Sequence, residues 1–241
     1  MKLLVSVVGA DEARAAAAAG ADIIDVKDPG EGALGAPSPD TLQSIVAAVG
    51  GAAPVSAALG DMPDLPHTAA LAARGAAACG ADFVKVGLRG TRSLTRAIAV
   101  VAAVAEAVPA TTAVIAAAYA DGAAAAPPAL DPLLLPELVR ATGIAGALVD
   151  TLVKDGPGLY GLLSPAVVTE LAERTRAAGG SFGVAGQLRV DDLRRVVADI
   201  VGVRSAVCRG GDRSAALDPE LVAAAVAELR AAAEPRVVTR G

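Results

Sequence analysis

The stretch Gly20-Ala21-Asp22-Ile23-Ile24 recurs later in the chain as Gly80-Ala81-Asp82-Phe83-Val84. In both copies a glycine ends an alanine-rich helical run, and a short apolar segment follows at once. Strands that alternate with helices in this way are typical of βα units, in which helices cover a parallel sheet. The repeated step therefore predicts an α/β protein.

The same alternation continues on both sides of the two copies. Helix starts are indicated by Ser38, Asp131, Ser164 and Asp218, because each is a capping residue directly before a proline. Eight such units without a break in composition favour a single-domain (β/α)8 TIM barrel over residues 1–241. An open doubly wound sheet is the alternative, although no GxGxxG or Walker sequence follows the first strand. Strands are predicted at residues 3–8, 22–27, 55–59, 83–88, 112–118, 147–150, 182–185 and 200–203.

Composition narrows the class of protein. Hydrophobic residues make up 54% of the chain and aromatic residues only 2%, so Ala, Val, Leu and Ile must fill the core. No run approaches the roughly 18 to 20 apolar residues of a membrane span, and the apolar start of the chain is too short for a signal peptide. We therefore expect a cytoplasmic protein that does not bind membranes.

Charge and metal-binding residue types exclude further classes. The net charge is -5 and the arginines are scattered, which leaves no basic surface for nucleic acid. The two cysteines lack CxxC spacing and there is one histidine, so neither a metal site nor a disulfide framework is expected. The expected partner is a small molecule, and the oligomeric state, including a homo-oligomer, stays open.

Lysine placement is the most informative feature of the sequence. The chain has 21 basic residues but only four lysines, of which Lys27, Lys85 and Lys154 lie in or just after predicted strands. Lysine, unlike arginine, can lose its proton near neutral pH and form an imine. Chance placement or simple anion binding is the alternative explanation for these lysines.

Side-chain alternation predicts where these groups point. Asp25 and Lys27 share one face of the second strand, and Lys85 takes the same inward direction from the fourth. Alternate strands build one layer inside a barrel, so Asp150 of the sixth strand is expected to join them. We expect that crowding of the two ammonium groups leaves one amine neutral and nucleophilic, while Asp25 and Asp150 transfer protons. A buried ion-pair network without catalysis is the alternative.

Glycine-rich loops after the seventh and eighth predicted strands indicate a phosphate site. Barrels of this kind frequently bind phosphate there, through free backbone N–H groups. Polar side chains also follow the fifth predicted strand, at the same end of the barrel. The residues expected to bind substrate or its phosphate are Lys154, Gly186, Arg209, Gly210, Gly211, Tyr119 and Asp121.

The segment from Asp22 to Ala36, which contains Asp25-Val26-Lys27-Asp28-Pro29-Gly30, closely resembles the (5-formylfuran-3-yl)methyl phosphate synthase family. The resemblance continues in order through long blocks and covers nearly the whole chain, which makes it far more specific than a short motif. The further blocks are residues 55–61, 83–88, 90–93, 119–121, 150–156, 200–208 and 210–213.

The resemblance implies a TIM barrel that converts two molecules of glyceraldehyde 3-phosphate into (5-formylfuran-3-yl)methyl phosphate, with loss of phosphate and water. It implies a lyase of methanofuran-type carrier biosynthesis that needs neither a metal nor an organic cofactor. It further implies that Lys27 forms a Schiff base and that Lys85 accepts a proton. Asp25, Asp150 and Lys154 are implied to assist.

Two features depart from the family pattern. Arg209 stands where family members often have lysine, which keeps the charge of a phosphate anchor. Residues 123–126 are alanines where the family is often more polar, which leaves open what covers the mouth after the fifth strand. Other functions also stay open, because fold alone does not settle function. The alternatives are another class I aldolase, a phosphosugar isomerase, or a non-catalytic barrel that binds a phosphorylated ligand.

Overall fold

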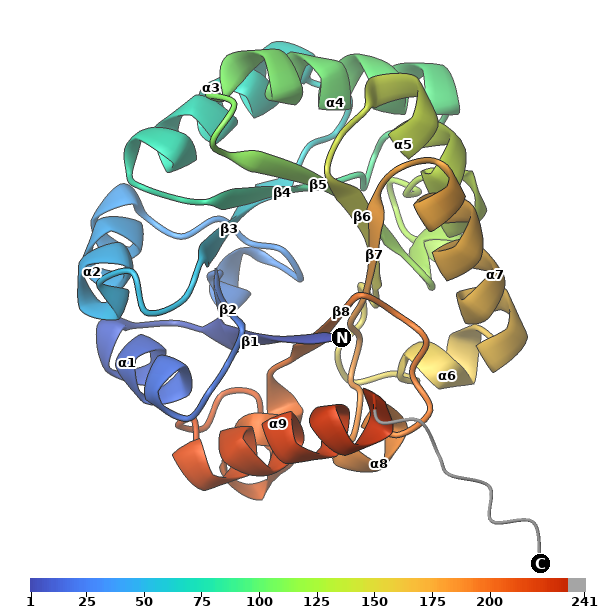
Figure 1. Ribbon diagram of the computed structural model, residues 1–241. Helices are drawn as coiled ribbons and strands as arrows, with labels where there is room; N and C mark the ends of the chain where they lie inside the picture. The colour runs from blue at the N-terminus through green and yellow to red at the C-terminus, as the bar shows by residue number, and fades with distance from the viewer. Residues whose placement is uncertain (234–241) are drawn as a thin grey trace, which may run out of the picture.

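Eight parallel strands close into a barrel in the computed structural model, which describes residues 1–233 (Figure 1). Each strand pairs with its neighbour in sequence, and the last strand returns to the first, where Gly202 aligns with Leu4. The predicted single-domain (β/α)8 TIM barrel is confirmed, and the open sheet is excluded. Residues 234–241 of the predicted domain lie outside the described residues. The strands are β1 (Lys2–Val7), β2 (Ile23–Val26), β3 (Val55–Asp61), β4 (Phe83–Gly87), β5 (Ala113–Tyr119), β6 (Gly146–Asp150), β7 (Ser181–Val184) and β8 (Ile200–Val203).

Helices surround the barrel (Figure 1) and several begin where the sequence predicts. Ser38 and Ser164 accept backbone N–H groups of the first helical turn, which fixes the starts of α2 and α7. Asp131 instead caps a 3-10 turn, Pro132–Leu134, that precedes α5. None of the helices within residues 1–233 has the length and apolar composition needed to cross a membrane. The helices are α1 (Ala10–Ala18), α2 (Pro39–Val49), α3 (Pro66–Ala78), α4 (Leu94–Ala107), α5 (Leu135–Thr142), α6 (Leu159–Leu162), α7 (Pro165–Ala177), α8 (Val190–Leu193) and α9 (Pro219–Ala233).

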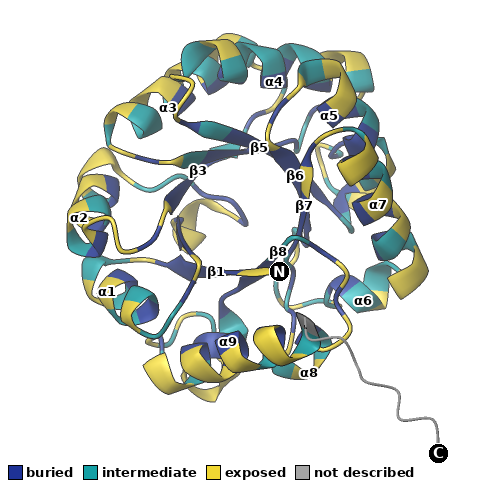
Figure 2. Ribbon diagram, in the orientation of Figure 1, coloured by how far each residue is buried: buried dark blue, intermediate teal, exposed yellow. Residues whose placement is uncertain are grey.

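The core lies between the strands and the helices, and a smaller apolar cluster fills the barrel interior. Figure 2 shows buried strands inside helices whose outer faces are exposed. Val26 and Val84 belong to the outer core, whereas Ile115 and Leu148 belong to the interior cluster. Successive side chains of a strand point to opposite faces. Since the valines of β2 and β4 point outward to the helices, the polar residues between them point into the barrel.

Candidate active site

A cavity of about 280 Å³ opens among the loops at the carboxyl ends of the strands. Side chains of β1, β2, β4 and β6 line its inner part, and the loops after β6, β7 and β8 line its rim. The carboxyl ends of barrel strands are the end at which TIM-barrel active sites form. The structure brings together all four predicted catalytic residues at this cavity, namely Asp25, Lys27, Lys85 and Asp150.

Lys27 carries the amine most suited to nucleophilic chemistry. It directly follows β2, and the whole residue is only 8% exposed. Burial lowers the pKa of its amine from 10.5 to about 8, against the opposing effects of Asp150 and Asp25. The charges of Lys85 and Lys154 lower the pKa further, but by less than burial does. The lowered pKa of one amine agrees with the expectation, but desolvation is its largest cause and crowding by other ammonium groups is a smaller one.

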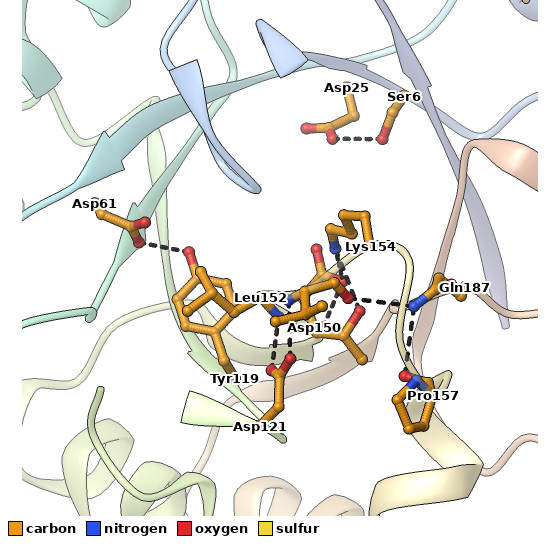
Figure 3. A network of polar contacts seen from close by, with 12 residues as sticks. Ser6, Asp25, Asp61, Tyr119, Asp121, Asp150, Leu152, Lys154, Pro157 and Gln187 are labelled. Carbon is orange, nitrogen blue, oxygen red and sulfur yellow. Dashed lines mark hydrogen bonds and ion pairs between the residues drawn. The ribbon is translucent and has the colours of Figure 1, made fainter. Parts of the chain in front are cut away.

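Lys85 of β4 forms a buried ion pair with Asp25 of β2, across the barrel interior from the intervening β3. Its Nζ lies 2.6 Å from Asp25 Oδ1, and both side chains are almost completely buried. The Ser6 hydroxyl donates to the other carboxylate oxygen at 3.0 Å, as Figure 3 shows. Asp25 Oδ2 is thus hydrogen-bonded, whereas Oδ1 has the close Lys85 Nζ as its ion-pair partner but accepts no hydrogen bond within the described residues. The pair lies at the cavity.

Asp150 and Lys154 form a second pair at the end of β6. Lys154 Nζ donates to Asp150 Oδ1 at 2.7 Å (Figure 3), and the backbone N–H of Thr151 donates to the same oxygen. Burial raises the pKa of Asp150, but the charges of Lys154 and Lys27 together with these hydrogen bonds outweigh burial and leave the pKa below its ordinary value. Asp150 is therefore a carboxylate at neutral pH, and its charge also acts on Lys27.

The loops after β7 and β8 supply the groups suited to an anion. Gly186 and Gly211 line the cavity, as does Arg213. Arg209 and Gly210 lie in the same β8 loop but outside the set of described residues that line the cavity. Of the residues predicted to bind phosphate in these two loops, Gly186 and Gly211 thus line the cavity and Arg209 and Gly210 do not, whereas Arg213, to which sequence reasoning gave no role, does. Phosphate binding by these loops stays a prediction. The signal in the sequence that could have identified Arg213 is its position just after the glycine-rich segment of the β8 loop.

Comparison with protein families settles the relationship of this chain. Residues 3–226 match the family of 4-HFC-P synthase. The chain belongs to this family. Two 4-HFC-P synthase relatives named (5-formylfuran-3-yl)methyl phosphate synthase support the assignment. The protein from Methanosarcina mazei is 40% identical over 96% of this chain and 100% of its own length. The protein from Methanocaldococcus jannaschii is 40% identical over 92% of this chain and 97% of its own length.

Solved structures support the fold of the 4-HFC-P synthase family but show nothing more, because their sequence identity is low. Phosphoribosyl anthranilate isomerase from Thermotoga maritima superposes with a TM-score of 0.66 at 14% identity, over 96% of this chain and 99% of its own. Thiamine phosphate pyrophosphorylase from Pyrococcus furiosus gives 0.64 at 15% identity, over 97% of each chain. Both comparisons span almost the complete barrel.

Tyr119 and Asp121 of this 4-HFC-P synthase family member lie at the end of β5, as the sequence suggested, but both side chains are engaged by other parts of the protein. The Tyr119 hydroxyl is fully buried and donates to Asp61 at 2.5 Å (Figure 3), and Asp121 accepts two backbone N–H groups of the β6 loop. Neither is among the described residues that line the cavity. Burial, and then the charge of Asp61, raise the pKa of Tyr119 well above its ordinary value, so its proton stays in place. Direct substrate contact by Tyr119 and Asp121 stays a prediction that the geometry does not favour.

Arg204 is a cavity residue to which sequence reasoning gave no role. Its guanidinium donates to both oxygens of Glu12, and also to the backbone carbonyls of Ser6, Arg213 and Ala215. These contacts use all five of its N–H groups. Arg204 therefore fixes the β8 loop to β1 and α1, and Arg213 is left as the arginine suited to a ligand.

The site can perform imine and proton-transfer chemistry with its own side chains. It offers one amine of lowered pKa on Lys27, two lysine–carboxylate pairs that line the same cavity and act electrostatically on that amine, and an arginine at the rim. Within residues 1–233, no group of three or more His, Cys, Asp or Glu side chains is placed to hold a metal ion.

Proposed function

We propose that this protein joins two molecules of glyceraldehyde 3-phosphate into (5-formylfuran-3-yl)methyl phosphate through an imine on Lys27. It would act as a carbon–oxygen lyase in the biosynthesis of methanofuran-type carriers. The observation that carries the proposal is the buried Lys27 amine, whose pKa is about 8, in a chain of the 4-HFC-P synthase family. Two relatives named for this product support it.

The proposed chemistry begins with attack of neutral Lys27 on the carbonyl of one triose phosphate, which releases water. The imine makes the adjacent C–H acidic, so loss of that proton gives an enamine. Elimination of phosphate from this triose leaves an enol whose C3 attacks C2 of the second triose phosphate, which has reached its ketose form by a proton shift. Ring closure and loss of two waters give the furan, and hydrolysis of the imine releases the aldehyde and regenerates the Lys27 amine. Only phosphate and water leave, so no oxidant or reductant is required.

Proton transfer in this scheme is assigned to the two ion pairs. The Lys85–Asp25 pair, whose Nζ and Oδ1 lie 2.6 Å apart, is assigned to removal of the proton from the imine intermediate, with Lys85 as the acceptor. Asp150 faces Lys27 as a carboxylate and stabilises the positive charge of the protonated imine. Lys154, Arg213 and the backbone of Gly186 and Gly211 are assigned to the substrate phosphates.

Product analysis with glyceraldehyde 3-phosphate as the sole substrate tests the proposal. A product with furan absorbance, released with inorganic phosphate, is the expected result. A linear sugar phosphate would instead identify another class I aldolase or a phosphosugar isomerase. No turnover, together with no covalent adduct after borohydride reduction, would identify a barrel that only binds phosphorylated ligands.

The pH dependence of kcat/KM should report the Lys27 amine. With a pKa of about 8, roughly one Lys27 in ten is neutral at pH 7, compared with about one in three thousand for an amine with the ordinary value of 10.5. Since the neutral amine is the nucleophile, kcat/KM should rise about tenfold per pH unit below pH 8 and level off above it. Steady-state rates between about pH 6 and 9.5 measure this profile.

Asp150→Asn provides a control on the assignment of this profile. Asp150 raises the pKa of Lys27, so its neutralisation should move the rising limb to lower pH. If the pH at which kcat/KM rises is the same in Asp150→Asn as in the wild type, another group controls the rate. The same conclusion follows if kcat/KM of the wild type increases as the pH falls.

A further inference from the structure

The loop between β6 and α6 carries Lys154 and is tied to both neighbouring loops. On one side, Asp121 accepts the backbone N–H of Leu152 at 2.6 Å and that of Val153 at 2.8 Å. On the other side, the Gln187 amide donates to the carbonyl of Val153 at 3.3 Å and to that of Pro157 at 3.4 Å. Figure 3 shows these contacts surrounding the loop. The loop is therefore held by side chains that belong to different strand ends.

The Asp121 contacts immediately precede Lys154 in the chain. One carboxylate that accepts two consecutive N–H groups fixes the orientation of both peptide planes. Lys154 follows them directly, and its Nζ reaches back to Asp150 at 2.7 Å while its side chain stays 17% exposed. The carboxylate thereby sets the point from which the lysine extends across the cavity.

The Gln187 side of the loop shows local backbone strain. Gln187 has φ +53°, a left-handed conformation that is uncommon for a residue other than glycine. Gly186 before it has φ +105°, and a Cβ there would lie 2.7 Å from the Thr151 side chain. Such conformations persist where the surroundings require them, and they cluster at functional sites. The β7 loop is thus packed closely against the segment that Asp121 holds.

We propose that Asp121 is a positioning residue, which fixes Lys154 against Asp150 and does not itself contact the substrate. Asp121 lies outside the set of described residues that line the cavity, whereas Lys154 and Gln187 line it. The effect of Asp121 on turnover rests on the proposed function, because it acts through the phosphate contact assigned to Lys154. Its effect on the position of Lys154 does not depend on that function.

Asp121→Asn tests the proposal through turnover. The amide keeps one acceptor oxygen and loses the other, so KM for glyceraldehyde 3-phosphate should rise about tenfold while kcat changes by less than about threefold. Asp131→Asn is the matched control, since Asp131 also accepts a backbone N–H in an exposed loop, but that of Leu133 in its own segment and not one of the loop that carries Lys154. In an Lys154→Gln background, Asp121→Asn should raise KM no further. A rise that persists in that background would show direct substrate contact and overturn the proposal.

Amine labelling tests the position of Lys154 without any substrate. The rate of acetylation at Lys154, followed by mass spectrometry, should increase several-fold in Asp121→Asn while the rate at exposed Lys2 stays constant. Gln187→Gly releases the opposite side of the loop and should increase the Lys154 rate in the same direction, which gives a second variant if Asp121→Asn fails to fold. An unchanged rate at Lys154 in the folded variants overturns the proposal. Faster labelling in a protein that makes no furan would reject the proposed function and leave the positioning role supported.

Discussion

Lys27→Arg is expected to reduce furan formation by about 10³-fold or more, while the charge of the side chain is retained. A guanidinium stays protonated at neutral pH and forms no imine, so the variant loses the nucleophile and keeps a cation. The borohydride-trapped adduct on this residue should disappear at the same time. Mass spectrometry of the reduced complex and product absorbance measure the two losses.

Lys2→Arg is the control for the same exchange at an exposed position, and its activity should be unchanged. Thermal unfolding of both variants separates lost chemistry from lost folding, because arginine is bulkier than lysine in the buried site. An adduct on Lys85 in the wild type would reverse the roles assigned to the two lysines. Furan formation by folded Lys27→Arg at near the wild-type rate would refute the imine mechanism.

The fold was predictable because each strand carries its own local signal. Short apolar runs, several of them preceded by a glycine or followed by a capped helix, are sufficient to define eight βα units, and their boundaries agree with the structure to within about two residues. The convergence of Asp25, Lys27, Lys85 and Asp150 was predictable for a related reason. Side-chain alternation and the layered barrel interior are general properties of strands, so they apply before any coordinates are known.

The rest of the site depends on loop conformation, which has no comparable periodicity. Asp121 and Arg213 lie in loops where a single backbone torsion decides whether a side chain meets the cavity or a neighbouring peptide. The origin of the lowered pKa of Lys27 was also beyond sequence reasoning, because the degree of burial depends on how closely the loops pack over the amine. The sequence shows which residues can carry a charge, whereas the desolvation of a given amine depends on how the folded chain surrounds it.

The largest expected loss of stability follows removal of one partner of the Lys85–Asp25 pair. Lys85→Met leaves the Asp25 carboxylate buried with the Ser6 hydroxyl as its remaining side-chain partner, and Asp25→Asn leaves the Lys85 ammonium without its counter-ion. Breaking a buried pair in this way costs about 3–5 kcal/mol. Urea unfolding followed by circular dichroism measures the free energy of unfolding of each variant.

The double variant Lys85→Met/Asp25→Asn distinguishes stability from catalysis. It removes both charges together, so no ion is left uncompensated, and at least half of the stability lost in Lys85→Met should return. Furan formation should nevertheless stay at least about 100-fold below the wild type, because the proton-transfer pair is absent. Additive losses of stability would show that the pair contributes no coupling, and recovery of turnover in the double variant would show that these two charges are not the proton carriers. The pair thus stabilises the barrel interior because each buried charge neutralises the other, and two neutral residues can fill the same space without that need. Its role in the reaction, in contrast, requires a group that can gain and lose a proton.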